Sequence, residues 1–297
     1  MLAFGLCVDR RYFDPGLVTL ASIADATPHQ ARRATAVRVL SSDLSRSEAT
    51  VMARFARRLG FGSFDLRWAR PTRSAVMADT AYISVATYLR FAFTAEFVAR
   101  PYLIYIDADV LVRGDITSEL ASLGKSRLGG VVDEFNAAIG SCPALPGLVS
   151  DRPELVGRPY LNAGVLWLHA SGLGTVQRGV EAALRDGARY ILHNDQDALN
   201  LWLLESGSGQ AMSAQFNRFE IARFLEFGDW TRRVVPRGPS NSDAALIHFV
   251  GAHKPWLSSC PATEDVREYR AVRRRALRLA GRDDALVSGA TARHEGR

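Results

Sequence analysis

Two aspartates, Asp107 and Asp109, follow the most strand-like run of the sequence, residues 102–106. The run is apolar, aromatic and β-branched without alternation, which is typical of a strand covered on both faces in a parallel sheet. Carboxylates two positions apart share one side of an extended backbone and, after a bend, can bind one hard cation. Because ligands of open α/β sheets bind at the carboxyl ends of strands, the pair indicates a metal site. The alternative is a solvated turn after a buried strand.

Two later stretches also carry polar residues near the start of an element. Asn162 stands near the start of a predicted strand over residues 160–169, beside a glycine that permits close backbone approach. Asp195 and Asp197 lie in the first turn of a predicted helix over residues 193–204. Helix capping and compensation of the helix dipole would account for both aspartates without any function.

An arginine and a histidine are each open to two interpretations. Arg90 is the only cation in a predicted helix over residues 84–98. Its guanidinium either pairs or extends to solvent at the core edge, or it contacts a phosphate or sugar near the aspartate pair. His248 lies in a predicted strand over residues 245–250, where a satisfied core residue and a metal ligand are the alternatives.

Strand-like and helix-like segments alternate from the N-terminus onward, which predicts a parallel, doubly wound α/β sheet built by right-handed crossovers. Residues 134–159 contain four prolines and three glycines without a sustained period, and we expect a long loop facing the substrate. The predicted strands are residues 3–8, 36–40, 64–68, 102–106 and 128–132, and the predicted early helices begin at Asp14 and Ser47.

The composition is that of an ordinary globular protein, with 297 residues, 47% hydrophobic and 23% charged. No apolar run approaches the roughly 18 to 20 residues that span a bilayer, and the N-terminus lacks the basic region of a signal peptide. The three cysteines, at positions 7, 142 and 260, form no Cys-x-x-Cys pair and indicate neither a disulfide framework nor a zinc site. We therefore expect a cytoplasmic protein.

The formal net charge of +6 comes almost wholly from arginine, since Lys125 and Lys254 are the only lysines. The spacing of apolar residues over 266–282 predicts an amphipathic helix, in which an apolar stripe lies beside a group of arginines. One interpretation is peripheral contact with the anionic inner face of the plasma membrane, and the other is a solvated or dimer-contacting helix. No series of base-stacking aromatic residues accompanies the charge, so nucleic acid is not expected. The arginines of the segment are 267, 270, 273, 274, 275, 278 and 282.

Four stretches with chemical character stand in a fixed order along the chain: YIDADVLV, YLNAGVL, NDQDALN and IHFVGAHKPW, beginning at residues 105, 160, 194 and 247. Together they resemble glycosyltransferase family 8, the retaining sugar-nucleotide transferases that include bacterial lipopolysaccharide galactosyl- and glucosyltransferases. The resemblance covers about residues 2 to 256. It implies a GT-A fold, which is a Rossmann-like, mixed but mostly parallel sheet with helices on both faces, over residues 1–258. Residues 259–297 would then be a basic C-terminal helix and tail.

The resemblance implies a metal site and a catalytic set. Asp107, Asp109 and His248 would hold a divalent cation, usually Mn²⁺ with Mg²⁺ as the alternative, that bridges the two phosphates of the donor. Two carboxylates and an imidazole suit Mn²⁺ better than a metal that prefers thiols. The implied catalytic residues are Gln196, Asp195 and Lys254.

The donor would be a UDP-hexose and the acceptor a saccharide or glycolipid. By resemblance Asp9 and Tyr12 would contact the uridine, and Lys254 would meet the diphosphate. The donor sugar would be lined by Asn162, Asp195 and Gln196, with Arg90 near it. Residues 134–159, where acceptor recognition is expected, show no likeness, and the acceptor stays open. The implied donor-binding residues are Asp9, Tyr12, Arg90, Asp107, Ala108, Asn162, Ala163, Asp195, Gln196, Gly251 and Lys254.

Two other functions compete with transfer. The first is a catalytically inert protein that binds a sugar nucleotide or glycan on the same fold, against which the intact set of polar residues argues. The second is a phosphatase of the haloacid dehalogenase type, in which a strand also precedes Asp-x-Asp. Those phosphatases carry Thr or Val two residues after the second aspartate, whereas this sequence has Leu111. The sequence therefore favours transfer.

Overall fold

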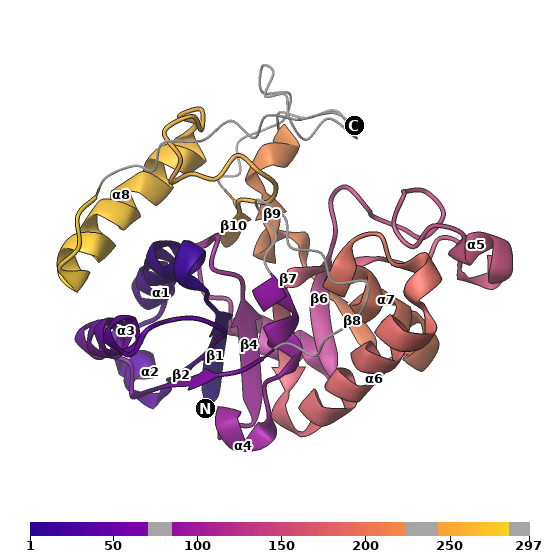
Figure 1. Ribbon diagram of the computed structural model, residues 1–297, viewed down its shortest axis with the longest axis horizontal. Coiled ribbons are helices and arrows are strands. Elements are labelled where there is room, and N and C mark those ends of the chain that lie inside the picture. The colour runs from indigo at the N-terminus through magenta and orange to yellow at the C-terminus, as the bar shows by residue number, and fades with distance from the viewer. Residues whose placement is uncertain (71–84, 224–242, 285–297) are drawn as a thin grey trace.

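A central sheet organises the protein (Figure 1). The computed structural model describes residues 1–70, 85–223 and 243–284, and within these the sheet has seven strands in the order β3-β2-β1-β4-β7-β6-β8. Strand β7 is antiparallel to both β4 and β6, and the other neighbours are parallel. The predicted mostly parallel α/β sheet is confirmed. The strands are β1 Leu2–Cys7, β2 Ala36–Ser41, β3 Ser63–Trp68, β4 Tyr102–Ile106, β6 Leu128–Val132, β7 Leu161–His169 and β8 Gly209–Met212.

Each face of the sheet has its own apolar core, because successive side chains of a strand point to opposite faces. Phe4 and Ile104 lie in the core shared with α1, α3 and α8, whereas Ala3 and Leu103 lie in the core shared with α6 and α7. Figure 1 shows these two groups of helices on either side of the sheet. The helices are α1 Phe13–Ala26, α2 His29–Ala34, α3 Arg46–Arg58, α4 Ala95–Val98, α5 Leu148–Asp151, α6 Leu173–Asp186, α7 Asn194–Ser206 and α8 Glu264–Ala280.

The predicted continuous helix over residues 84–98 is wrong. The described part forms a 3-10 helix over Val85–Phe91 and the separate short helix α4, and Ser84 lies outside the described residues. Thr94 starts α4 by accepting a hydrogen bond from the backbone N–H of Phe97 at 3.2 Å. Phe93, in the break, is fully buried with its ring 6.2 Å from that of Tyr105. Apolar spacing therefore reflected burial of a bent segment and not a single helical face.

A second, three-stranded sheet lies beyond the carboxyl end of β4, with the order β5-β10-β9. The predicted strand over residues 245–250 forms here as β10, Leu246–His248, and not in the central sheet. It pairs antiparallel with β5, Val110–Val112, and parallel with β9, Arg218–Phe219. The chain thereby returns to the residues that follow the aspartate pair.

The amphipathic helix predicted over residues 266–282 is confirmed as α8, which packs beside α1 and α3 (Figure 1). Val266, Tyr269 and Leu277 are fully buried in the core that α1 shares. The apolar stripe of α8 is therefore covered by the protein itself. Residues 285–297 of the basic tail lie outside the described residues. Among the helices of the described part, none has the length and apolar character needed to cross a bilayer.

Candidate functional site

The site lies where the order of strands along the chain reverses. The chain runs outward from β1 to β2 and β3, and then returns to the other side of β1 as β4. Strands β1 and β4 are parallel neighbours, with Gly5 opposite Tyr105. Asp9 and Asp107 follow their carboxyl ends, at the topological switch point where doubly wound sheets bind ligands. The sheet itself thus brings the first two predicted residues to one edge.

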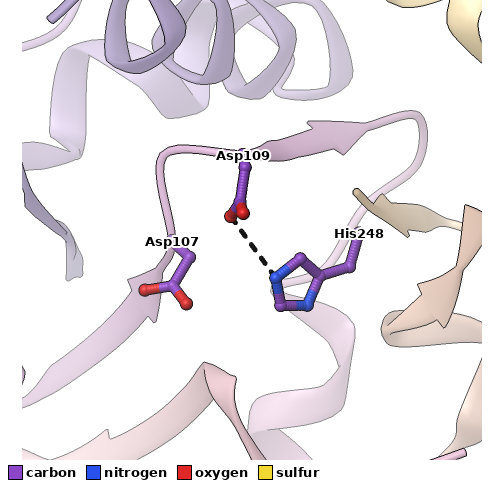
Figure 2. Close-up of side chains that lie close together, drawn as sticks. All are labelled: Asp107, Asp109 and His248. Atoms are coloured by element: carbon purple, nitrogen blue, oxygen red, sulfur yellow. Dashed lines mark ion pairs between the residues drawn. The ribbon is translucent and has the colours of Figure 1, made fainter. Parts of the chain in front are cut away.

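Asp107, Asp109 and His248 converge there (Figure 2). One potential ligand atom from each lies within 4.8 Å of the others. Nε2 of His248 is 3.3 Å from Oδ1 of Asp109, the ion pair dashed in Figure 2, and the Asp107 carboxylate lies near both groups. The antiparallel register of β5 and β10 places His248 opposite Val110, the residue directly after Asp109. A residue far along the chain therefore completes the trio through strand pairing.

This trio fits a hard divalent cation by its chemistry and its shape. Carboxylate oxygen and imidazole nitrogen are ligands that Mn²⁺ and Mg²⁺ accept, and the trio contains no thiolate. Gly164 keeps the space beside the trio open, because a Cβ atom there would lie 2.3 Å from Cε1 of His248 and 3.0 Å from Oδ2 of Asp107. Only glycine can occupy this position without moving the proposed ligands.

Lys254 neutralises Asp109 in the buried part of the site. Its Nζ donates to Oδ2 of Asp109 at 2.5 Å and to the carbonyl oxygen of Phe249 at 2.7 Å. Burial acts to raise the pKa of Asp109, but the neighbouring Lys254 and His248 outweigh it and hold that pKa well below its usual range. Burial lowers the pKa of Lys254 and Asp109 raises it, with a net rise. The pair is therefore a lysine ammonium and an aspartate carboxylate.

Arg90 connects Asp107 to the start of α7. Its guanidinium lies 3.2 Å from Asp107 and 3.0 Å from Asp195, and it donates to the carbonyl oxygens of Thr87 and Ala163. Its side chain is only 4% exposed. Burial is the largest influence on Asp107 and raises its pKa above the usual value, although Arg90 partly offsets this. The guanidinium thus balances the buried carboxylate of Asp195 and the partly exposed carboxylate of Asp107, which favours the paired interpretation of Arg90.

On the side of α7, Gln196 and Asn162 belong to one hydrogen-bonded network. Oε1 of Gln196 accepts from the backbone N–H of Ala163 at 3.1 Å and from Nδ2 of Asn162 at 3.0 Å. Both amides donate to Oδ2 of Asp133, at 3.0 Å from Gln196 and 3.1 Å from Asn162. The orientation of the Gln196 amide is thereby fixed, with its oxygen engaged by two donors.

Asp195 and Asp197 have different roles in the structure. Asp197 is fully buried and accepts hydrogen bonds from Leu192, His193 and Tyr160, each at 2.6 Å. It therefore fixes the start of α7, as capping alone would predict. Asp195 instead forms the ion pair with Arg90.

The residues predicted to contact uridine lie on the first turn after β1. Asp9 is buried and accepts from the backbone N–H of Tyr12 at 2.9 Å. Tyr12 packs edge to face on Trp256, with ring centroids 5.5 Å apart, and burial raises its pKa to about 12. The ring of Tyr12 thus reaches the loop that contains Lys254.

The remaining predicted donor-binding residues belong to the backbone around the trio. Ala108, between the two aspartates, is buried, and its carbonyl oxygen accepts from the hydroxyl of Thr19 at 2.9 Å. Gly251 has φ of 76°, a conformation that favours glycine, in the turn that leads from β10 to Lys254. Both positions shape the path of the backbone, since neither has a long side chain.

Three site residues were not predicted from the sequence. Asp133 follows the predicted strand over residues 128–132, so the strand-end argument that selected Asp107 would also have selected it. Tyr105 donates from its hydroxyl to Oδ1 of Asp107 at 2.5 Å, yet in the sequence it resembled an ordinary core aromatic residue. Asn217 precedes β9 and faces His248, with 3.0 Å between Oδ1 and Nδ1. No local pattern marked it, because the pairing of β9 with β10 creates the contact.

The sequence of this chain matches a known protein family. The model of Glycosyl transferase family 8 matches residues 5–260. Lipopolysaccharide 1,2-glucosyltransferase of Escherichia coli K12 is 31% identical over 185 residues, which is 58% of this chain and 49% of that protein. Glycosyltransferase GlyE of Streptococcus pneumoniae is 24% identical over 179 residues, covering 59% of this chain and 38% of GlyE. The chain thus spans about half or less of the curated relatives it matches.

Solved structures extend the likeness to nearly the whole chain. A structure of the galactosyltransferase LgtC in complex with donor and acceptor sugar analogues superposes with a TM-score of 0.66 at 24% identity, covering 94% of this chain and 95% of that one. Apo GlyE superposes with a TM-score of 0.63 at 18% identity, covering 92% of this chain and 60% of GlyE. At these identities the superpositions establish the GT-A fold that the sequence resemblance implied.

Proposed function

Because the chain belongs to glycosyl transferase family 8, we propose that it is a retaining hexosyltransferase that moves galactose or glucose from a UDP-sugar to a glycan acceptor. The observation that carries the proposal is the convergence of Asp107, Asp109, His248 and Lys254 at the switch point of the sheet. The proposed acceptor is lipopolysaccharide or another cell-surface saccharide, in line with the names of the matching E. coli relatives. The proposed setting is the cytoplasm, where a reducing medium keeps Cys7, Cys142 and Cys260 as free thiols.

Asp107, Asp109 and His248 would hold the divalent cation, with Mn²⁺ proposed and Mg²⁺ as the alternative. A bound cation would supply a Lewis acid that neutralises charge on the donor diphosphate. The chain's own contribution beside it is Lys254, which uses two of its three ammonium hydrogens on Asp109 and Phe249. The third would donate to a phosphate oxygen as the leaving group gains charge.

Retention of configuration through front-face attack agrees with the arrangement of Gln196. Its amide oxygen is neutral, and it already accepts from Ala163 and Asn162, so it is a poor nucleophile. In the proposed step the bond from the sugar anomeric carbon to the phosphate oxygen breaks and the acceptor oxygen bonds on the same face. The acceptor proton passes to the departing phosphate. Gln196 and Asp195 orient the sugar, and a covalent glycosyl adduct trapped on either residue would overturn this mechanism.

We propose that the donor binds at the edge formed by the carboxyl ends of β1 and β4 and by the loop of Lys254. We propose that Asp9 and Tyr12 contact the uridine, since both lie on the first turn after β1. Asn162, Ala163 and Gln196 would line the sugar. Their hydrogen-bonded network continues to Asp133, which offers a carboxylate on the side of the long loop expected to face the acceptor.

The experiment is a UDP-release assay with Mn²⁺, in which UDP-glucose and UDP-galactose are each offered with and without a truncated lipopolysaccharide acceptor. Release that depends on one donor and rises with acceptor is expected. Donor binding without release in any combination would favour the inert binding protein. Release of phosphate from simple phosphate esters would favour the phosphatase.

The packing of α8 limits which side chains of residues 266–282 are available for the proposed membrane contact. Because the apolar stripe of α8 packs in the core, contact with an anionic leaflet would use the exposed guanidinium groups, such as those of Arg274 and Arg278, and would be electrostatic. Residues 1–258 then form the proposed transferase domain, and residues 259–297 a basic extension whose helix is docked on it.

A further inference from the structure

We propose that Asn217 is a positioning residue that keeps a hydrogen on Nδ1 of His248 and so leaves Nε2 of that ring for the metal. The inference rests on the proposed metal site and goes beyond the ligands themselves. Asn217 is 1% exposed and lies directly before β9, whose parallel pairing with β10 sets it beside His248.

A backbone N–H can only donate, and one such group fixes the orientation of the side-chain amides beside His248. The N–H of Gly164 lies 2.9 Å from the side chain of Asn162, so the Asn162 atom that faces it is the carbonyl oxygen Oδ1. The other end of that amide, Nδ2, faces the carboxylate of Asp133, which only accepts when ionised. Both neighbours of Asn162 therefore agree on one orientation.

The same polarity passes to the histidine. An Asn217 amide atom lies 2.8 Å from Oδ1 of Asn162, and since that oxygen accepts, the Asn217 atom is the donor Nδ2. The opposite end of Asn217 is then Oδ1, which lies 3.0 Å from Nδ1 of His248. An amide oxygen only accepts, so Nδ1 must bear the hydrogen. Three successive contacts thus transmit the direction of one backbone N–H to the imidazole.

Asn217 counteracts the effect of Asp109, whose carboxylate lies near the other ring nitrogen of His248. Nε2 of His248 lies 3.3 Å from Oδ1 of Asp109. A carboxylate at this distance favours a hydrogen on Nε2, which would occupy the lone pair that a metal needs. With Asn217 absent, a neutral His248 would place its hydrogen on Nε2 and donate it to Asp109. Asn217 is therefore the group that retains the metal-binding tautomer.

The imidazole of His248 is held in its orientation by neighbours on two sides. Phe219 packs edge to face on the imidazole, with ring centroids 5.6 Å apart and planes at 88°. On the other side, Cε1 of His248 occupies the space that a Cβ at Gly164 would need. The network also continues from Asn162 to Gln196, so the polarity that sets the His248 tautomer also orients the amide proposed to hold the donor sugar.

The test reads the tautomer directly, by ¹⁵N NMR of the full chain labelled in its six histidines, with His248→Gln to assign the resonance. In the metal-free wild type, and with diamagnetic Mg²⁺ added, Nδ1 should stay protonated. In Asn217→Leu the neutral ring should shift its hydrogen to Nε2, and Mn²⁺ measured by EPR should bind roughly 10- to 100-fold more weakly. Asn217→Asp keeps an acceptor at Nδ1 and should retain the wild-type tautomer.

The matched control is Asn200→Leu, which removes an equally buried amide that bonds only backbone groups, those of Leu161 and Gln196, and should leave the His248 resonance and Mn²⁺ affinity unchanged. An Nδ1 without a hydrogen in the wild type would overturn the inference. This measurement on the wild type does not depend on whether Asn217→Leu folds. An Asn217→Leu protein with unchanged tautomer and affinity overturns it as well. Absence of transferase activity with Nδ1 protonated would instead refute the proposed function alone.

Discussion

The ammonium nitrogen of Lys254 lies 2.5 Å from Oδ2 of Asp109, in a site where both side chains are at most a tenth exposed. A residue of the loop after β10 is thus joined to the turn after β4. Lys254 is the only lysine or arginine of that loop, residues 249–263. The contact holds it at the edge where the donor diphosphate is proposed to lie.

Lys254→Gln should reduce kcat for transfer by about 100-fold or more, because a charge facing the leaving diphosphate is lost. Lys254→Arg should not restore activity, since the larger planar guanidinium does not fit a site built around two close acceptors. Steady-state kinetics with the UDP-sugar measure both. Lys125→Gln changes the only other lysine, which is exposed, and should behave as wild type. Equal kinetics for the two lysine positions would remove Lys254 from the mechanism.

Arg90→Lys should destabilise the protein by about 1 to 3 kcal/mol, because lysine keeps the charge but cannot replace a guanidinium that pairs with both Asp107 and Asp195 and donates to two backbone carbonyls. Urea unfolding of the metal-free protein measures this change. Arg57→Lys, an exposed substitution on α3, should change stability by less than about 0.5 kcal/mol. A small effect at Arg90 would show that the two carboxylates are neutralised in another way.

The capping box of α3 predicts a pH-dependent stability. Glu48 accepts from the hydroxyl and backbone N–H of Ser45, and these bonds lower its pKa from 4.5. A carboxyl with a lowered folded-state pKa stabilises above its unfolded pKa and loses that contribution as pH falls through the folded value. Glu48→Gln should therefore cost about 0.5 to 1 kcal/mol at pH 7 and less at pH ~3, where the carboxyl is closer to its folded-state pKa. Denaturant unfolding at the two pH values checks this, and a cost independent of pH would contradict it.

Helix α8 should be required for folding, because Arg270 donates to the carbonyls of Pro255, Leu257 and Cys260 while the apolar stripe fills the core. A chain ending at Thr263 should unfold at lower denaturant or aggregate. Arg274→Gln with Arg278→Gln should leave stability unchanged and weaken co-sedimentation with anionic vesicles at low salt. If this double variant and the wild type sediment equally, those arginines are no membrane contact.

The sequence was informative at the end of β4, although the same strand-end argument was not applied to Asp133. Apolar runs of β-branched residues predicted β1, β2 and β4 to within about a residue, and the carboxylates that follow β4 stood out against them. The antiparallel insertion of β7 and the separate sheet of β10 were not predictable, because strand order depends on packing between segments far apart in the chain. Asp107 and Asp109 could therefore be selected locally, whereas the position of His248 beside them required the resemblance.

Residues that act through another side chain were the hardest to find. Asn217 has no periodic neighbour pattern, and its role appears only when β9 and β10 pair. Tyr105 lies in an apolar run and packs in the core, yet its hydroxyl donates to Asp107. The break at Phe93 was missed for a similar reason, since burial on a bent backbone imitates helical spacing over a short segment.

The most direct test of the metal-dependent transferase is the release of UDP from UDP-glucose and UDP-galactose by the wild type, Asp109→Asn and Asp115→Asn, with Mn²⁺ or with EDTA. Asp115 is an exposed aspartate six residues further along, so its substitution controls for loss of one charge. We predict turnover by the wild type and Asp115→Asn with Mn²⁺, a loss of more than about 100-fold for Asp109→Asn, and none for any form in EDTA. Full turnover in EDTA, or by Asp109→Asn, would contradict the account.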